Sequence, residues 1–448
     1  MKILTRVKDS IQESPPRFLV TGFLFVIIIG ALLLHLPISS REGIWTPLLD
    51  CFFTATSATC VTGLVTLNTA AHWTTFGHVI IMLLIQIGGL GFMTVATLMA
   101  LLLGKRITLR DRLIIQEQMN TFSLSGMVKL IRYVIVSTLI IEGIGAVLLS
   151  FKFIPMFGLK GIWFSIFHSI SSFCNAGFDI IGPNSLNEFI NSPLIMLIVS
   201  FLIILGGVGF NVYMDITSKK FNFKKYTLHT KIVLVMTSIL LLVGFFGVLL
   251  LEFDNPETIG NQGALGKILG SWFQSTTVRT AGYTAFDQAA LRDSTAVICI
   301  LLMFIGGSPA GTAGGIKTTT FAALWMVLLN EIRGNEDIVV FKRRVRFSVI
   351  RKAIAILMIG VLWVAFVIFM MLIVEPYSLL DISYEAVSAF ATVGLTRNLT
   401  PNLTAFSQVL IIISMYLGRV GTMTLVFALA NKKRRSLYKE AYGNIIIG

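Results

Sequence analysis

Charged residues are scarce in this sequence. Only 13% of its 448 residues are Asp, Glu, Lys or Arg, whereas 55% are hydrophobic. A water-soluble chain of this length needs far more polar surface to cover its core. Apolar runs of about 20 residues, the length that crosses a bilayer, recur along the chain instead. The composition therefore excludes a soluble globular protein and predicts a polytopic integral membrane protein.

Residue types that build reactive and metal sites are also few. The four cysteines lie in or beside apolar segments without a CxxC pair, so buried reduced thiols are the simplest interpretation. The five histidines lack metal-ligand spacing, and no convergent nucleophile–base pair or paired carboxylates occur within the spans. We therefore expect no enzyme, no covalently bound cofactor and no metal site of the His/Cys type. The N-terminus lacks the apolar core of a signal peptide, so no removed leader is expected.

The net charge of +14 is not spread evenly. Of the 36 Lys and Arg residues, 27 fall in the segments 2–17, 105–132, 219–231, 333–352 and 432–439. Basic clusters between successive pairs of hydrophobic spans are typical of cytoplasmic loops. Both termini (1–17 and 431–448) and three loops are therefore predicted to be cytoplasmic. The runs KRRVR and KKRR are then topology signals, and contact with anionic lipid or an acidic partner is the alternative.

A fourfold repeat organises the chain. Eight spans are expected at 18–36, 76–103, 130–151, 192–216, 231–252, 294–330, 350–374 and 404–430. Each odd span is separated from the next by a stretch too short and too polar to cross: DCFFTATSATCVTGLVT, SIFHSISSFCNAGFDII, SWFQSTTVRTAGYTAFD and ISYEAVSAFATVGLTRN. The predicted repeats are 18–104, 130–218, 231–332 and 350–430.

Two glycine motifs fix the register of the repeats. The first is the single glycine of each intervening stretch, at Gly63, Gly177, Gly282 and Gly394. The second is GGLG at Gly88, GGVG at Gly206, GGSP at Gly306 and GRVG at Gly418, at offsets of 25, 29, 24 and 24 residues. One such glycine is compatible with an ordinary turn at a span end. Four pairs at nearly constant spacing predict a unit of span, re-entrant half-crossing and span, used four times.

Such a repeat predicts a pore. Non-helical backbone at membrane depth is tolerated only where it is buried in protein or lines a wet cavity. Four short helices dipping in from outside would point their partially negative C-terminal ends at a common axis, which favours a cation there. The strands that follow would offer backbone carbonyls to replace a monovalent cation's hydration shell. The fold class expected is all-α, with eight transmembrane helices and four re-entrant pore helices around a central pore.

With TVGL, TAGY and the stretch GGSPAGTAGGIKTTT, the sequence resembles the Trk/Ktr/HKT superfamily of cation transporters. Within it, the chain is similar from residue 18 onward to the KtrB-type membrane subunits of bacterial Ktr potassium uptake systems. The resemblance implies potassium uptake through one pore per subunit of a homodimer in the bacterial cytoplasmic membrane. It also implies a cytosolic KtrA-type nucleotide-binding ring, through which nucleotide acts.

The resemblance assigns potassium binding to the four glycine segments. The residues concerned are Val61, Thr62, Gly63, Asn175, Ala176, Gly177, Thr280, Ala281, Gly282, Thr392, Val393 and Gly394. Glycine rather than serine at position 63 favours potassium over sodium in this superfamily. Asn175 and Arg279 depart from the fourfold pattern. K⁺ is the only metal ion implied; sodium dependence is a family trait for which the sequence places no site.

Residues 306–320 interrupt the third repeat's second span. In repeats one and two the second glycine motif is expected to continue as helix, whereas here Pro309 and a Gly/Thr-rich run follow it. We expect an intramembrane gate below the filter, moved through the flanking helix near 321–333; a kinked helix is the alternative. The gating residues assigned are Gly306, Gly307, Pro309, Gly311, Gly314, Gly315, Lys317 and Arg419.

Three intramembrane charges need an explanation, because an unpaired charge in a span is costly. Arg419 replaces the second glycine of GRVG, and we expect it below the filter, pairing with the third repeat's loop. Its alternative is neutralisation by a helix-end carbonyl or an acid. Glu142 is either a structural hydrogen-bonding group or the partner of a charge on another span. Lys317 lies in the loop, whereas Arg279 is expected to face outside or to cap a segment end.

Two other functions were weighed. GTAGGIKT is similar to a phosphate-binding loop, but Ile316 separates the glycine from the lysine and the context is membrane helix. A sodium- or proton-coupled carrier also uses broken helices, but usually in two inverted halves with acids at the midplane. Four repeats of one direction, with only Glu142 deep in a span, favour a channel-like pore.

Overall fold

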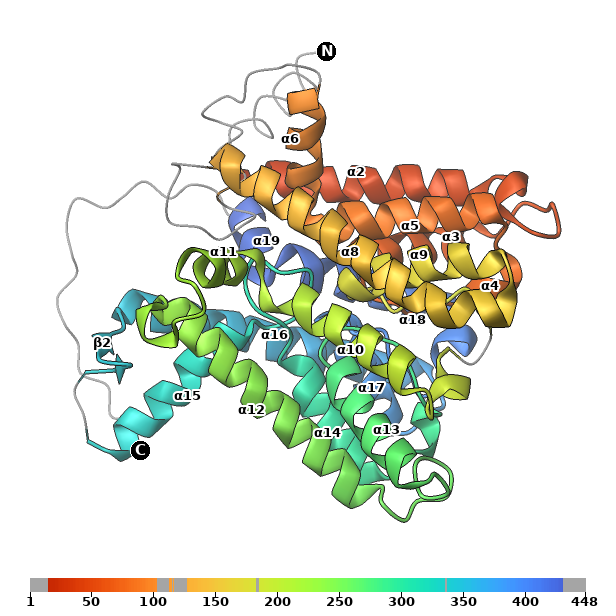
Figure 1. Ribbon diagram of the computed structural model, residues 1–448. Helices are drawn as coiled ribbons and strands as arrows, with labels where there is room; N and C mark the ends of the chain where they lie inside the picture. Colours follow the sequence, from red (N-terminus) through yellow and green to blue (C-terminus); the bar gives the residue numbers. More distant parts are fainter. Residues whose placement is uncertain are drawn as a thin grey trace.

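The computed structural model describes residues 15–102, 113, 114, 116, 127–182, 185–334 and 337–429 (Figure 1). The predicted C-terminal segment 431–448, residues 1–14 and most of the basic segment 105–132 lie outside these residues.

Four long helices form the first spans of the repeats: α2 (Pro15–His35), α8 (Met127–Phe157), α12 (Leu228–Leu251) and α16 (Phe347–Val374). Each is long and apolar enough to cross a membrane. Proline follows the end of two of them, because it lacks a backbone donor, clashes with the preceding turn and disfavours helix in the residue before it. Thus α2 ends ahead of Leu36-Pro37, and α16 ends ahead of Glu375-Pro376.

A shorter helix follows each first span: α3 (Leu48–Cys60), α9 (Lys160–Phe173), α13 (Ala264–Thr277) and α17 (Leu379–Ala391). These are the predicted pore helices. Most of their residues are buried although many are Ser or Thr, so they lie inside the protein and not against lipid. Each leads directly into one of the four predicted filter segments.

The second spans are all divided in two. Their outer halves are α5 (Thr75–Leu90), α10 (Pro193–Val208), α14 (Asp293–Phe304) and α18 (Ala405–Val420). Their inner halves are α6 (Phe92–Leu102), α11 (Phe210–Ser218), α15 (Thr318–Ile332) and α19 (Thr422–Leu429). The expectation that only the third repeat departs from continuous helix was therefore wrong.

The cause of the break is the last glycine of the second motif. Gly91, Gly209 and Gly421 have φ of 84°, 94° and 91°, a conformation that an α-helix does not contain and that favours glycine. In repeat two the two halves meet at a bend of 90°. In repeat three the position is Pro309, and the interruption extends from Ile305 to Lys317.

The four repeats form a closed ring. The outer second-span helix of each repeat packs on the pore helix of the next: α5 on α9, α10 on α13, α14 on α17 and α18 back on α3. The order around the ring is therefore one, two, three, four. This arrangement confirms a mainly helical fold of four span–pore helix–span units.

Short elements complete the chain: α4 (Thr69–His72), η1 (Pro37–Ser39), η2 (Asn187–Phe189), η3 (Phe223–Lys225), η4 (Gln288–Ala290), η5 (Thr400–Asn402), and the antiparallel hairpin of β1 (Val339–Val340) and β2 (Arg343–Arg344). The hairpin lies near α15 and α12, at the same end of the molecule as α11 (Figure 1).

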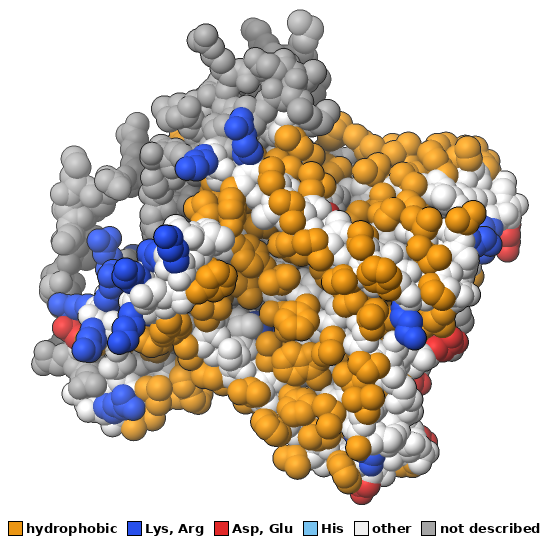
Figure 2. Space-filling model, in the orientation of Figure 1, with side chains coloured by type: hydrophobic (Ala, Val, Ile, Leu, Met, Phe, Trp, Pro, Cys, Tyr) orange, Lys and Arg blue, Asp and Glu red, His pale blue; other side chains and the backbone are white. Residues whose placement is uncertain are grey.

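The surface separates into zones along the long helices. Figure 2 shows apolar side chains spread over the face formed by α8, α10 and α12, with basic side chains gathered at the end that carries β2 and acidic ones at the opposite end. Phe201, Leu139 and Leu362 are each about 60% exposed (62%, 63% and 63%). Apolar surface of this extent requires lipid or protein contact.

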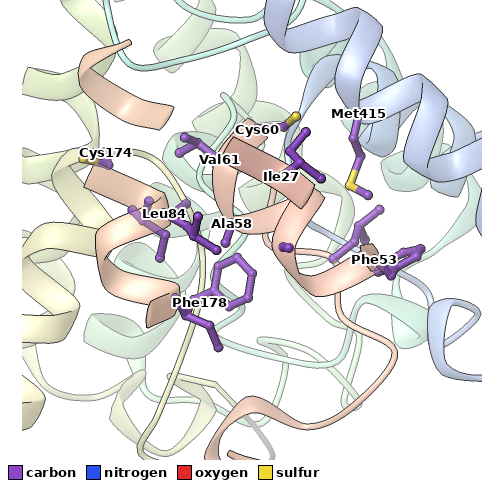
Figure 3. Close-up of a cluster of buried hydrophobic side chains, with 14 of the residues drawn as sticks. Ile27, Phe53, Ala58, Cys60, Val61, Leu84, Cys174, Phe178 and Met415 are labelled. Atoms are coloured by element: carbon purple, nitrogen blue, oxygen red, sulfur yellow. The ribbon is translucent and has the colours of Figure 1, made fainter. Parts of the chain in front are cut away.

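The buried core surrounds the pore helices. Figure 3 shows Ile27 of α2, Phe53 and Ala58 of α3, Leu84 of α5 and Met415 of α18 converging in one cluster. Side chains of repeats one and four thus interdigitate around the first pore helix.

Candidate ion pathway

All four predicted filter segments share one backbone conformation. The residue two positions before each glycine has positive φ: Val61 (58°), Asn175 (61°), Thr280 (72°) and Thr392 (52°). The glycines themselves have φ of 99°, 68°, 81° and 93°. Three of the four non-glycine residues are β-branched, for which the left-handed region is a costly outlier. Because the same strained conformation occurs in all four segments, we infer that their function depends on the geometry of the backbone.

This conformation suits a wall of carbonyl groups. In a regular strand, successive residues face opposite sides. Successive residues of opposite hand instead bring main-chain groups of one kind to the same side of the chain. The residues between the two positive-φ positions, Thr62, Ala176, Ala281 and Val393, keep the ordinary hand.

The glycines show that the four segments meet at one axis. A Cβ added to Gly63 would lie 2.6 Å from Ala176 O of repeat two, and one on Gly282 would lie 2.5 Å from Val393 O of repeat four. A Cβ on Gly177 would overlap Ala281 O, and one on Gly394 would overlap Thr62 O. Each glycine thus faces the carbonyl of the next segment, in the same cyclic order as the helix packing.

The pore helices hold these segments by hydrogen bonds. The residue before each glycine donates its N–H back to the helix end: Thr62 to Ser57 O (2.8 Å), Ala176 to Ser171 O (2.7 Å), Ala281 to Thr277 O (2.9 Å) and Val393 to Ser388 O (2.8 Å). Because these bonds to the pore helices use the N–H groups of the segments, the carbonyl groups of the segments remain available.

Hydroxyl groups add a second set of bonds. The N–H of Gly63 donates to Ser57 Oγ (3.0 Å), and that of Gly394 donates to Ser388 Oγ (3.1 Å). In the other two repeats the hydroxyl donates instead, Ser171 to Phe178 O (3.0 Å) and Thr277 to Tyr283 O (2.6 Å). These hydroxyl residues were not predicted, although a Ser or Thr five or six positions before each glycine marks them in the sequence.

The second glycine motif lets the spans approach the pore helices. A Cβ on Gly88, Gly206 or Gly418 would overlap Thr59 O, Phe173 O or Phe390 O, each four residues before a filter glycine. In repeat three, a Cβ on Gly306 would overlap Gly314 O instead. The loop has taken the place that a pore helix end occupies in the other repeats.

The interrupted segment of repeat three is anchored to repeat two. Gly306 N–H donates to Ile316 O (2.9 Å), which closes the segment into a loop. Ser308 N–H donates to Gly207 O (2.9 Å), and Thr312 N–H donates to Gly206 O (3.1 Å). Thr312 Oγ1 also donates to Phe173 O (3.1 Å), at the end of the second pore helix. The loop is thus an ordered structure directly below the filter, not a kink.

Arg419 ties this loop to the first repeat. Its Nη1 donates to Thr312 O, and its Nη2 donates to Gly88 O and, at 3.1 Å, to Gly89 O. Both expectations for this residue are met together, because its partners are the loop of repeat three and the carbonyls near the end of α5. One guanidinium from repeat four thereby bridges repeats one and three.

A cavity of about 190 Å³ lies on the inner side of this bridge. Gly315, Lys317 and Arg419 line it, together with Gly89 and Phe390. Lys317 Nζ donates to Ala313 O (2.6 Å) within the loop. Of the remaining assigned residues, Gly307 and Gly311 lie against Gly207 O, and Gly314 lies against the Thr392 side chain. The loop therefore contacts the segments of repeats two and four.

Arg279 does not lie where the sequence placed it. Its side chain is 8% exposed, and it donates to Gly306 O (3.4 Å) and Thr237 O (3.5 Å). It therefore faces the protein interior behind the third predicted filter segment: of the two expectations, the outward-facing arginine was wrong, whereas its contact with Gly306 O places it at the end of α14. The reason is its position one residue after the C-cap of α13, which directs it toward the loop.

Glu142 is 5% exposed, and Gln86 Nε2 of α5 donates to its Oε2 (3.1 Å). The Cys174 thiol, just before the second filter segment, donates to its Oε1 (3.7 Å). Within the described residues no basic side chain pairs with it, which favours the hydrogen-bonding interpretation. The same residues contain no group of His, Cys, Asp and Glu that could hold a metal ion. The four cysteines are buried and free, as expected.

Comparison with known proteins gives a consistent assignment. Residues 19–436 match the family model TrkH, described as a cation transport protein. The chain is 41% identical to the Ktr system potassium uptake protein B of Bacillus subtilis, over 99% of this chain and 100% of that protein. It is 42% identical to the potassium/sodium uptake protein NtpJ of Enterococcus hirae, with the same coverage. The crystal structure of the potassium transporter TrkH from Vibrio parahaemolyticus has a TM-score of 0.70, with 18% identity, over 92% of this chain and 85% of that one.

Proposed function

The chain belongs to the TrkH family of cation transport proteins, and on this premise we propose that it takes up potassium through the ring formed by its four filter segments. It is a multi-pass membrane protein whose relatives are transport proteins and not enzymes. The observation that carries the proposal is the cyclic contact of each filter glycine with the next segment's carbonyl.

The chemistry of the ring supports a monovalent cation. Backbone carbonyls from four directions replace the water shell of an ion without placing a fixed negative charge at the axis. The four pore helices add the partial negative charge of their C-terminal ends, each of which leads into a filter segment. The glycines matter because a side chain at those positions would occupy the space between neighbouring segments.

We propose that the loop 306–320 closes this pathway from below, with Arg419 as its latch. Lys317 and Arg419 place two positive charges on the cavity under the ring, which raises the electrostatic barrier to a cation. Opening then requires the bond from Arg419 to Thr312 O to break and the loop to leave the cavity. The helix α15 begins at Thr318, so the last three residues of the predicted loop are its first turn, and it is the element that could move the loop.

A cytosolic KtrA-type nucleotide-binding ring is proposed as the regulator, with the chain acting as a homodimer. The name of the Bacillus relative, protein B of a Ktr system, supports a system of more than one component. The basic end of the molecule, around β2 and α15, is proposed to face the cytoplasm (Figure 2). Nucleotide would then act on the partner and reach the gate through α15.

The test is cation uptake in a host that lacks its own potassium uptake, comparing K⁺, Rb⁺ and Na⁺. We expect the chain to restore growth at low potassium and to take up Rb⁺ in preference to Na⁺. Uptake that survives unchanged in selectivity when all four filter glycines are replaced by serine would refute the filter assignment.

A sodium- or proton-coupled carrier is the second candidate, favoured by the potassium/sodium uptake name of the Enterococcus relative and by the buried Glu142. Replacing Glu142 by Gln preserves the hydrogen-bonding shape and removes the ionisable group. A carrier that uses this group would lose its dependence on the sodium or proton gradient. A pore in which Glu142 is structural would keep the same uptake at every gradient.

A further inference from the structure

Each repeat has two equivalent positions just outside its predicted filter segment, and the contact between them differs from repeat to repeat. One lies on the pore helix nine residues before the filter glycine, and the other lies two residues after that glycine. The residue pairs are Thr54 and Val65, His168 and Asp179, Phe273 and Thr284, and Glu385 and Thr396. In repeats two and four the two members contact one another, and in repeats one and three they have no such polar contact.

In repeat two the contact is between buried ionisable groups. His168 Nε2 lies 3.4 Å from Asp179 Oδ1, with the histidine side chain 0% and the aspartate side chain 9% exposed. The other ring nitrogen, Nδ1, lies 2.8 Å from Phe164 O. Both nitrogens thus face oxygen atoms, but Nε2 makes no hydrogen bond within the described residues, so its contact with Asp179 is a close approach of an imidazole and a carboxylate. Asp179 Oδ2 is buried without a hydrogen-bond partner, so its carboxylate depends on the contacts of Oδ1.

The contact between His168 and Asp179 is linked to the filter segment of repeat two. Asp179 Oδ1 also accepts the Ile181 N–H (2.5 Å), which bends the chain as it leaves the filter. The carbonyl of Phe178, directly before Asp179, accepts from Ser171 Oγ (3.0 Å) and from the hydroxyl of Tyr283 (3.1 Å). The outer end of this segment is therefore held from its own pore helix and from repeat three.

In repeat four the acid lies on the helix instead. Thr396 Oγ1 donates to Glu385 Oε2 (2.6 Å), and Thr400 Oγ1 donates to Glu385 Oε1 (2.5 Å). Glu385 is fully buried, so the two hydroxyls are what satisfies its carboxylate. The same two positions are thus in contact, but in repeat four the acidic residue lies on the pore helix, whereas in repeat two it follows the filter glycine.

Repeats one and three lack the connection. The hydroxyl of Thr54 has no partner, and Val65 is apolar. Phe273 is apolar, and Thr284 Oγ1 donates outward to Asn187 Oδ1 (3.0 Å). Because the ring order is one, two, three, four, the two braced segments lie on opposite sides of the axis.

We propose that His168–Asp179 and Glu385–Thr396 are two opposed braces that fix the outer ends of the second and fourth filter segments and thereby set the discrimination between potassium and sodium. These are positioning residues, since none is placed among the cation-binding segments. Discrimination by carbonyls depends on how many of them reach the ion and on how freely they move. Hydrogen bonds to a carboxylate are stronger than neutral ones, so they suit a restraint on two opposed walls. The inference rests on the proposed potassium uptake.

The test is tracer uptake of Rb⁺ and Na⁺ by the full chain in liposomes, reported as the ratio of the two rates. Asp179→Ala and Thr396→Val each remove one brace, and we expect each to lower the Rb⁺/Na⁺ ratio by about tenfold, with sodium uptake rising, because loss of a charge-assisted bond is worth roughly that factor. Asp179→Asn and Glu385→Gln keep the shape and an acceptor oxygen, so a smaller loss is expected.

Thr284→Val is the matched control, because it removes a hydroxyl at the equivalent position of an unbraced repeat. It should keep the wild-type ratio. Size-exclusion profiles and thermal stability in detergent establish that each variant is folded; if an alanine variant is not, the isosteric Asp179→Asn and Thr396→Val decide. A folded set with unchanged ratios overturns the inference, as does an equal loss of both ions. If the wild type itself fails to take up Rb⁺, the proposed function fails instead.

Discussion

The ring of proposed filter segments and the layer beneath it are built from the same four repeats but differ in symmetry. In the ring, every glycine faces the next segment's carbonyl, and the backbone angles repeat four times. In the second spans, three repeats have a short break at a glycine, whereas the third has the loop from Ile305 to Lys317. Four equivalent segments suit recognition of a spherical ion. One repeat that differs from the other three suits control of the ion's passage.

Substitution of a filter glycine should have the largest effect, because it breaks the symmetric layer. In Gly394→Ala the new Cβ would overlap Thr62 O, and φ of 93° disfavours any side chain. We expect the Rb⁺/Na⁺ uptake ratio to fall by about a hundredfold, equivalent to roughly 3 kcal/mol of lost discrimination. Gly143→Ala is the control, since Gly143 has open space around it. Retained selectivity in folded Gly394→Ala would contradict the symmetric filter.

Removal of the loop tests the asymmetric layer. Deleting 311–316 takes out the residues that fill the space below the ring, including Thr312. We expect uptake to be high and nearly independent of the regulatory partner, about tenfold above the resting wild type. The measurement is uptake with and without the partner. A folded protein that no longer conducts would show that the loop builds the pathway and does not close it.

Arg419→Ala should have a similar but smaller effect, because it unlatches the loop without removing it. The change also removes a positive charge from the cavity wall, and a barrier lowered by about 1 kcal/mol raises flux about fivefold. Arg419→Lys keeps the charge but cannot bridge Thr312 O and Gly88 O together. If Arg419→Lys matches the wild type, charge alone matters; if Arg419→Ala leaves uptake unchanged, the latch is refuted.

The smallest effect should come from a site outside both layers. Glu375 accepts the N–H (2.9 Å) and hydroxyl (2.7 Å) of Thr404, between α16 and α18. Burial alone would raise the pKa of Glu375, but hydrogen bonds from Ser407 and Thr404 outweigh it and lower the pKa below the ordinary value. The stabilisation is therefore complete above the unfolded-state pKa and is lost as pH falls through the lower folded-state pKa.

Thr404→Val should accordingly lower the melting temperature in detergent at neutral pH and reduce its fall on acidification, leaving ion selectivity unchanged. The loss should be about 1.5 kcal/mol, typical of one hydrogen bond to a charged group. A change in selectivity would mean that the outer loops also shape the filter.

The symmetric layer was largely predictable from the sequence, and the asymmetric one was not. Four glycines at nearly constant offsets marked the four segments that meet at one axis, because close backbone approach leaves no room for a side chain. The breaks at Gly91, Gly209 and Gly421 were missed, since a glycine inside an apolar run is compatible with continuous helix and its φ is set by tertiary packing. Arg279 was misplaced for a related reason: a residue next to a strained turn takes its direction from the turn.

The partner of Arg419 could be anticipated and its geometry could not. An arginine in a span requires acceptors, and the loop was the nearest polar stretch in a symmetric arrangement. That it also binds Gly88 O and Gly89 O depends on the end of α5, because the helix stops at Leu90 and its last carbonyls lack their usual helical partners.

The ring order has a consequence for how the protein is made. Three of its four helix contacts join neighbours along the chain, but α3 of repeat one packs on α18 of repeat four, and Tyr416 of α18 donates to Val20 O of α2 (2.5 Å). The ring therefore has a seam that joins the first part of the chain to be synthesised with the last. Until α18 is inserted, the Ser/Thr-rich first pore helix lacks its packing on α18, so a chain synthesised only to the end of repeat three would form an open arc and not a ring. The ring is therefore complete only when α18 has been inserted and packs on α3.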